Sequence, residues 1–179
     1  YSLGLDGLNV FLVLLTTVLW TAGTAFAAFR EQERAHLFFL MMLIGETATL
    51  GSFLAQDLLL FVLFFDLMLV PFYFLFGAWG SNREDGPTAS AATLKMIVYT
   101  LIGSLLMLVG VAWVGIHGNS FEIDSLTGAG FDSTWVFLAF CAAFCIKAPL
   151  FPLHGWLPIT YRQSSPEVTA LLSGVISKA

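Results

Sequence analysis

The fold of this chain is decided by the stretch Phe144-Cys145-Ile146-Lys147-Ala148-Pro149-Leu150-Phe151-Pro152-Leu153-His154-Gly155-Trp156-Leu157-Pro158. Lys147 ends an apolar run, and three prolines and one histidine follow it. Each proline lacks a backbone N–H and disfavours helix at the residue before it. We therefore expect the helix that carries Lys147 to break just after that lysine. In lipid, a broken helix is tolerated only where protein or water satisfies the freed backbone groups.

The sequence thus places the Lys147 charge, a helix break and the His154 imidazole together at membrane depth, and this combination has two interpretations. Ionisable residues inside a membrane usually mark an ion or proton pathway, because burying a charge in lipid is costly. Alternatively, Lys147 snorkels from near a helix end and the prolines merely end the helix. We favour the pathway, given how intramembrane charges usually behave. His154 would then either pass protons between cytoplasmic water and Lys147 or cap the broken helix by a hydrogen bond.

The composition places the chain in a membrane. Of its 179 residues, 58% are hydrophobic and only 11% are charged, whereas a soluble domain is about 25% charged. The apolar runs are long and lack the alternation of outer-membrane strands, so we expect an all-α fold. We expect about six spans, near 8–29, 35–55, 58–79, 91–116, 134–151 and 166–179, with a kink at Pro71. Both ends look like cuts, so we expect one transmembrane domain from inside a longer protein.

The basic residues predict an orientation. The loops alternate between two sides, and one side carries Arg30, Arg34, Arg83 and Arg162. The other side has no Lys or Arg and carries Asp6, Asp57, Glu122, Asp124 and Asp132. By the positive-inside rule the arginine side is cytoplasmic, and Tyr1 is outside.

Four ionisable residues share one depth. Counting about 1.5 Å per residue places Glu46, Asp66, Lys147 and Lys178 roughly 14–20 Å from one end of their segments. All four thus lie near the middle of a hydrocarbon core about 30 Å thick. Burial disfavours a charged lysine and a nearby carboxylate favours it, so a lysine whose partner moves away releases its proton. We favour such a relay over static ion pairs that fix the packing, because buried pairs contribute little stability.

No cofactor or metal site is expected in this chain. Cys141 and Cys145 are too few for an iron–sulfur cluster or a zinc site, and free cysteines pack as small apolar residues. We find no phosphate-binding loop, nucleophile triad or haem-ligand pair. The net charge of −5 does not suggest nucleic acid.

Several stretches resemble one family. Residues 147–158, together with Leu172-Ser173-Gly174-Val175-Ile176-Ser177-Lys178, are similar to the antiporter-like membrane subunits of respiratory complex I. The branch called subunit M in bacteria and subunit 4 in mitochondria is favoured by residues 5–8, 64–74, 77–80, 95–100 and 103–104. The resemblance covers essentially the whole chain.

The resemblance implies that the chain holds the family's third to eighth helices, most of the first antiporter-type repeat. Asp66 and Lys147 would form an acid–lysine pair, Lys178 would be the central lysine of the eighth helix, and Glu46 an acid of the fourth. Such inverted-repeat folds place ion sites at the midplane beside broken helices. The implied activity is proton translocation by a subunit of an NADH:quinone oxidoreductase, in a bacterial plasma membrane and among other membrane-arm subunits. NADH, FMN, iron–sulfur clusters and quinone would then bind to other subunits.

Two positions depart from the family pattern. The acid of the pair is usually Glu, and Asp66 is one methylene shorter, which implies a longer or water-bridged pair. Ile159-Thr160 replaces a usual Asp-Ala, which removes a carboxylate near the cytoplasmic mouth. Two other functions stay open: a subunit of a multi-chain sodium/proton antiporter of the same fold, and a non-conducting structural chain of the membrane arm.

Overall fold

The computed structural model describes residues 1–80, 88–127 and 133–176. Within them the chain is almost wholly helical and forms no strand beyond two isolated bridges, so the predicted all-α fold is confirmed. Arg83, Asp132 and Lys178, which the sequence singled out, lie outside the described residues.

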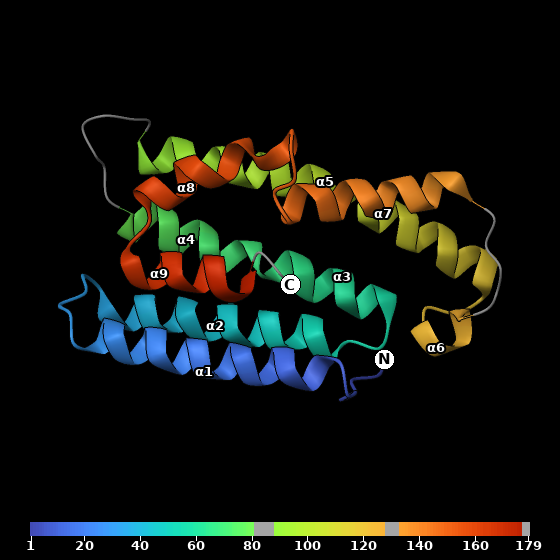
Figure 1. The fold of residues 1–179 in the computed structure, drawn as a ribbon, viewed down its shortest axis with the longest axis horizontal. Helices are drawn as coiled ribbons and strands as arrows, with labels where there is room; N and C mark the ends of the chain where they lie inside the picture. Colours follow the sequence, from blue (N-terminus) through green and yellow to red (C-terminus); the bar gives the residue numbers. More distant parts are fainter. Residues whose placement is uncertain (81–87, 128–132, 177–179) are drawn as a thin grey trace.

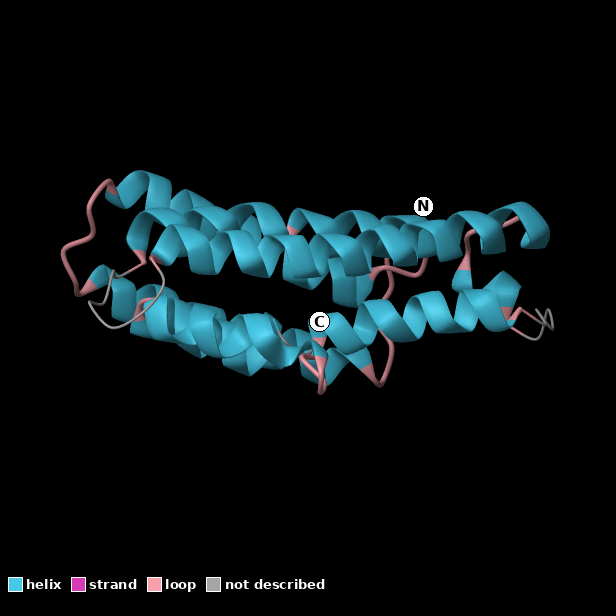
Figure 2. Cartoon of the chain, turned by 90° about the horizontal axis from the view of Figure 1, so that it is seen from above, coloured by secondary structure: helices cyan, strands magenta, loops and turns pink. Residues whose placement is uncertain are grey.

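The helices are long and follow one axis (Figure 2). They are α1 (Asn9–Ala28), α2 (Ala35–Leu54), α3 (Leu58–Leu67), α4 (Leu69–Trp79), α5 (Ala89–Gly118), α6 (Ile123–Leu126), α7 (Thr134–Lys147), η1 (Leu153–Trp156), α8 (Leu157–Gln163), α9 (Pro166–Leu171) and η2 (Leu172–Ile176). Four stretches are long and apolar enough to cross a membrane: Asn9–Ala28, Ala35–Leu54, Leu58–Trp79 and Ser90–Gly118. The apolar helix α7 is shorter and ends at Lys147, earlier than the predicted end near residue 151, because the prolines follow at once.

The helices pack side by side along one axis, and they form two rows when seen from above (Figure 1 and Figure 2). The pair α1 and α2 forms one edge, α3, α4 and α9 lie in the middle, and α5 lies at the other edge with α7 and α8. Helices α7 and α8 lie end to end along α5, so the break between them falls near the middle of the long axis. Ile146, Lys147 and Trp156 are buried at this break, whereas Leu150 and Phe151 between them are exposed.

The third long apolar helix, Leu58–Trp79, is divided into α3 and α4 by a single residue. Asp57 starts α3, since its carboxylate accepts hydrogen bonds from the N–H groups of Leu59 and Leu60. This residue is Met68, which keeps helical backbone angles and lies three residues before Pro71, where the sequence predicted the kink. Pro71 has no N–H to bond the Leu67 carbonyl and its ring crowds that group, so the distortion falls on the preceding turn.

Candidate functional site

The helix break after Lys147 is supported by the protein itself. The N–H of Ala148 bonds the Phe144 carbonyl at 2.7 Å, and that of Leu150 bonds the Cys145 carbonyl at 2.9 Å. Trp156, on the far side of the break, donates its indole N–H to the Ile146 carbonyl at 3.1 Å. These bonds satisfy backbone groups that a break at membrane depth would otherwise leave bare.

Lys147 is buried at the end of α7, with 7% of its surface exposed. Its Nζ lies 3.9 Å from the Met68 sulfur and 4.3 Å from the centre of the Phe65 ring. Both contacts are weak partners for an ammonium group: a cation–π contact and a thioether acceptor. The charged end of Lys147 thus lies among core side chains, which disfavours the interpretation of Lys147 as a snorkelling residue.

A small cavity lies beside this ammonium. Its volume is about 20 Å³, and its lining includes Lys147, Met68, Thr100 and Trp156. A cavity needs roughly 10–15 Å³ and polar partners to hold one water molecule. The cavity therefore has the volume of one water molecule next to Lys147, although most of its lining is apolar.

Asp66 lies on the last turn of α3 and bonds α5 rather than α7. Its carboxylate accepts a hydrogen bond from the hydroxyl of Ser104. In the described part of the chain no ion pair joins Asp66 to Lys147, although the carboxylate is close enough to attract the ammonium electrostatically. Asp66 also lines a hollow of about 340 Å³ between α4 and α5, whose other walls are mainly aliphatic. The structure thus places the acid and the lysine in one region without direct contact.

The other residues singled out by the sequence lie apart from this centre. Glu46 is half-buried on α2, and the described residues give it no ion pair or hydrogen bond. His154 is exposed in η1, where its ring packs 5.7 Å from that of Phe151. In the described ranges its imidazole makes no hydrogen bond to the broken helix, and its predicted part in proton transfer stays a prediction. Lys178 cannot be placed, since it lies beyond residue 176.

Sequence reasoning missed Ser104 as the partner of Asp66. Thr100 and Ser104 are buried polar residues one turn apart on α5, and this spacing was the available signal. Thr100 lines the cavity of Lys147, and Ser104 bonds Asp66. One buried polar face of α5 therefore bonds Asp66 and lines the cavity beside Lys147.

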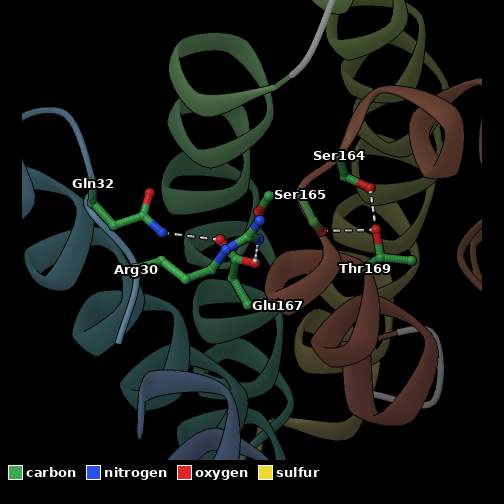
Figure 3. A network of polar contacts seen from close by, with 6 residues as sticks. All are labelled: Arg30, Gln32, Ser164, Ser165, Glu167 and Thr169. Atoms are coloured by element: carbon green, nitrogen blue, oxygen red, sulfur yellow. Dashed lines mark hydrogen bonds and ion pairs between the residues drawn. The ribbon is translucent and has the colours of Figure 1, made fainter. Parts of the chain in front are cut away.

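A second polar cluster, also missed, ties the α1–α2 connection to the start of α9 (Figure 3). The buried carboxylate of Glu167 lies 3.3 Å from Nη1 of Arg30 and accepts a hydrogen bond of 3.1 Å from the side-chain amide of Gln32. Nearby, the hydroxyls of Ser164 and Thr169 lie 2.5 Å apart. The cluster fixes where the chain re-enters the bundle after α8.

Comparison with known proteins matches this chain to a family. Residues 55–179 match the family described as "NADH:quinone oxidoreductase/Mrp antiporter, TM". NAD(P)H-quinone oxidoreductase chain 4 1 of Synechococcus sp. (strain JA-2-3B'a(2-13)) is 37% identical over 99% of this chain, and the match covers 34% of that relative. The chain thus spans about a third of the length of this curated relative.

Two solved structures that share the fold have chains more than 25% identical in sequence to this one. A chain of respiratory complex I from Thermus thermophilus with bound NADH superposes with a TM-score of 0.77 at 32% identity, over 96% of this chain and 36% of its own. A chain of the Mrp complex from Dietzia sp. DQ12-45-1b gives 0.80 at 28% identity, over 98% of this chain and 33% of its own. Together with the family match, these likenesses show that the chain belongs to the NADH:quinone oxidoreductase/Mrp antiporter transmembrane family.

Proposed function

We propose that this chain is part of a proton-translocating membrane subunit of an NADH:quinone oxidoreductase. The observation that carries the proposal is Lys147, a buried ammonium at a helix break beside a water-sized cavity, with Asp66 near but not bound. The names of the relatives point to the same class of complex. The chain would bind no redox cofactor itself, so NADH, FMN, iron–sulfur clusters and quinone would bind other subunits.

The proposed relay uses the separation of the acid from the lysine. When Asp66 moves toward Lys147, the ammonium is stabilised and keeps its proton. When the Asp66 carboxylate is hydrogen-bonded to Ser104, as in this structure, the Lys147 ammonium is buried without its partner. Lys147 would then release its proton to water in the cavity. Redox energy from elsewhere in the complex would drive Asp66 between these positions, and the proton would pass toward Lys178. Glu46 and His154 stay in the proposal as an acid of the same layer and a group on the cytoplasmic side.

The proposed orientation puts Arg30, Arg83 and Arg162 in the cytoplasm and Tyr1 outside, in a bacterial plasma membrane. Its support is the excess of arginine on one side. The contact of Arg30 with Glu167 agrees with this, since it brings together two loops that the alternation assigns to one side. Other membrane-arm subunits and lipid would cover the exposed apolar faces.

The test is Lys147→Ala in the full-length subunit within the assembled complex. We expect proton uptake per NADH oxidised by inverted vesicles to fall sharply, because no other group replaces the ammonium at the cavity. The matched control is Arg34→Gln, which removes one positive charge from an exposed loop. Undiminished uptake in Lys147→Ala would overturn the relay. Reduced yield of complex with unchanged protons per electron would instead favour a structural chain.

A second candidate is a subunit of a multi-chain sodium/proton antiporter. The likeness to the Dietzia Mrp complex favours it, because that chain covers 98% of this one at a TM-score of 0.80. The two candidates differ in their driving force. Proton exchange that requires sodium and proceeds without NADH would support the antiporter, whereas uptake that requires NADH oxidation would support the oxidoreductase.

A further inference from the structure

The face of α3 that meets Lys147 is not the face that carries Asp66. Phe65 and Met68, three residues apart and therefore on one side of a helix, both contact the ammonium. Asp66 follows Phe65 directly, and adjacent residues on a helix point about 100° apart. Its short side chain is therefore turned away from Lys147 and toward α5.

On α5 the carboxylate meets a donor placed to receive it. Ser104 is 1% exposed and donates its hydroxyl proton to Oδ1 of Asp66. Most buried hydroxyls in this bundle bond a carbonyl of their own helix, as Thr100 does with Met96 and Ser52 with Thr49. Ser104 differs, because its bond crosses from one helix to another and ends on a carboxylate.

We propose that Ser104 is a positioning residue that holds the Asp66 carboxylate away from Lys147. This inference rests on the proposed function and names the group that stabilises the separated state of the pair. Asp66 then has two alternative partners, the Ser104 hydroxyl and the Lys147 ammonium.

The proposal predicts how the two states respond to loss of the hydroxyl. A hydrogen bond to a charged group is strong enough to change the ratio of two states by roughly tenfold or more. Without it, Asp66 shifts toward Lys147, the lysine keeps its proton longer, and proton release slows. The effect of losing the Ser104 hydroxyl acts entirely through Asp66. It should therefore vanish in a variant whose residue 66 carries no negative charge to pair with Lys147.

The experiment uses the full-length subunit in the assembled complex. Ser104→Ala removes the hydroxyl, Ser104→Thr keeps it, and Ser104→Cys keeps nearly the same volume with a weaker donor. Ser52→Ala is the matched control, since it removes a buried hydroxyl that bonds only its own helix. Two readouts are compared: the infrared carboxylate band of Asp66, assigned by its loss in Asp66→Asn, and proton uptake per NADH oxidised.

We expect Ser104→Ala to shift the Asp66 band and to lower proton uptake severalfold, with Ser104→Thr restoring both and Ser52→Ala changing neither. In the Asp66→Asn background, Ser104→Ala should have no further effect on uptake. If Ser104→Ala does not assemble, Ser104→Cys should give the same changes in smaller measure.

An unshifted Asp66 band in Ser104→Ala or Ser104→Cys would overturn the contact between Ser104 and Asp66, whatever the proton uptake of that variant. Suppose that Ser104→Ala shifts the Asp66 band but leaves uptake normal, while Lys147→Ala abolishes uptake. That result would overturn the positioning role and leave the proposed function standing. An equal loss of uptake in both Asp66 backgrounds would show a packing role instead. Normal uptake in Lys147→Ala would remove the proposed function and the positioning role together.

Discussion

Arg30 and Glu167 lie 137 positions apart in the chain, yet Nη1 of the arginine is 3.3 Å from Oε2 of the glutamate. The glutamate side chain is 1% exposed and the arginine 49%, so the two ends of this ion pair differ in environment. Gln32 supplies a second donor to the same carboxylate (Figure 3). The α1–α2 connection thereby holds the start of α9 against the bundle.

Arg30→Gln should destabilise the assembled protein, because it leaves a buried carboxylate with one donor fewer. A lost hydrogen bond to a buried charged group costs about 1–3 kcal/mol, and the half-exposed arginine places this case near the lower end. The measurement is the thermal inactivation temperature of the complex in detergent. Arg34→Gln, which changes an exposed neighbour, should leave that temperature unchanged. An equal effect of both variants would contradict a specific clamp.

Ser165→Ala should be neutral or slightly stabilising. Ser165 precedes α9 at the N-cap position, but its side chain makes no capping bond, and its hydroxyl is buried with no hydrogen-bond partner among the described residues. An unsatisfied buried hydroxyl costs about 1–3 kcal/mol, so its removal relieves part of that cost. Thr169→Val is the contrasting variant, since the Thr169 hydroxyl bonds the Ser165 carbonyl at 2.9 Å. Thermal inactivation should separate the two, with only Thr169→Val destabilising.

Gly51→Ala should destabilise the contact of α2 with α3. A methyl group at Gly51 would fall 2.4 Å from the Phe64 ring, which must move to admit it. Overpacking of this kind costs about 1–3 kcal/mol. Gly77→Ala is the matched control, because a methyl group there meets nothing within 4 Å. Resistance of detergent-solubilised complex to proteolysis should fall for Gly51→Ala alone, and equal resistance would show that the ring yields freely.

Asp66→Asn should lower proton uptake severalfold, because a neutral amide cannot stabilise the Lys147 ammonium as an anion does. Asp66→Glu keeps the charge, so it should lower uptake less than Asp66→Asn does. It should also make uptake insensitive to Ser104→Ala, since glutamate would depend less on that hydroxyl. Equal uptake in Asp66→Asn and in the unaltered protein would exclude Asp66 from the relay.

The sequence by itself determined the local features, because these depend on neighbouring residues. The prolines after Lys147 end α7 at that residue, Pro71 distorts the turn before it, and Asp57 caps α3. The apolar composition required helices, since only they satisfy every backbone group within one membrane segment. The predicted depth of Asp66 and Lys147 rests on the same kind of reasoning, because a helix rises by about 1.5 Å per residue whatever its surroundings.

Only the tertiary structure decided which side chains meet at that depth. A sequence gives the height of a residue on its helix but not how far the helix is rotated toward each neighbour, since rotation is set by packing along the whole length. Because of this rotation, Phe65 and Met68 contact Lys147, and Asp66 forms its hydrogen bond with Ser104. The pairing of Arg30 with Glu167 likewise needed the fold, because it joins a loop to a helix start that lies far along the chain.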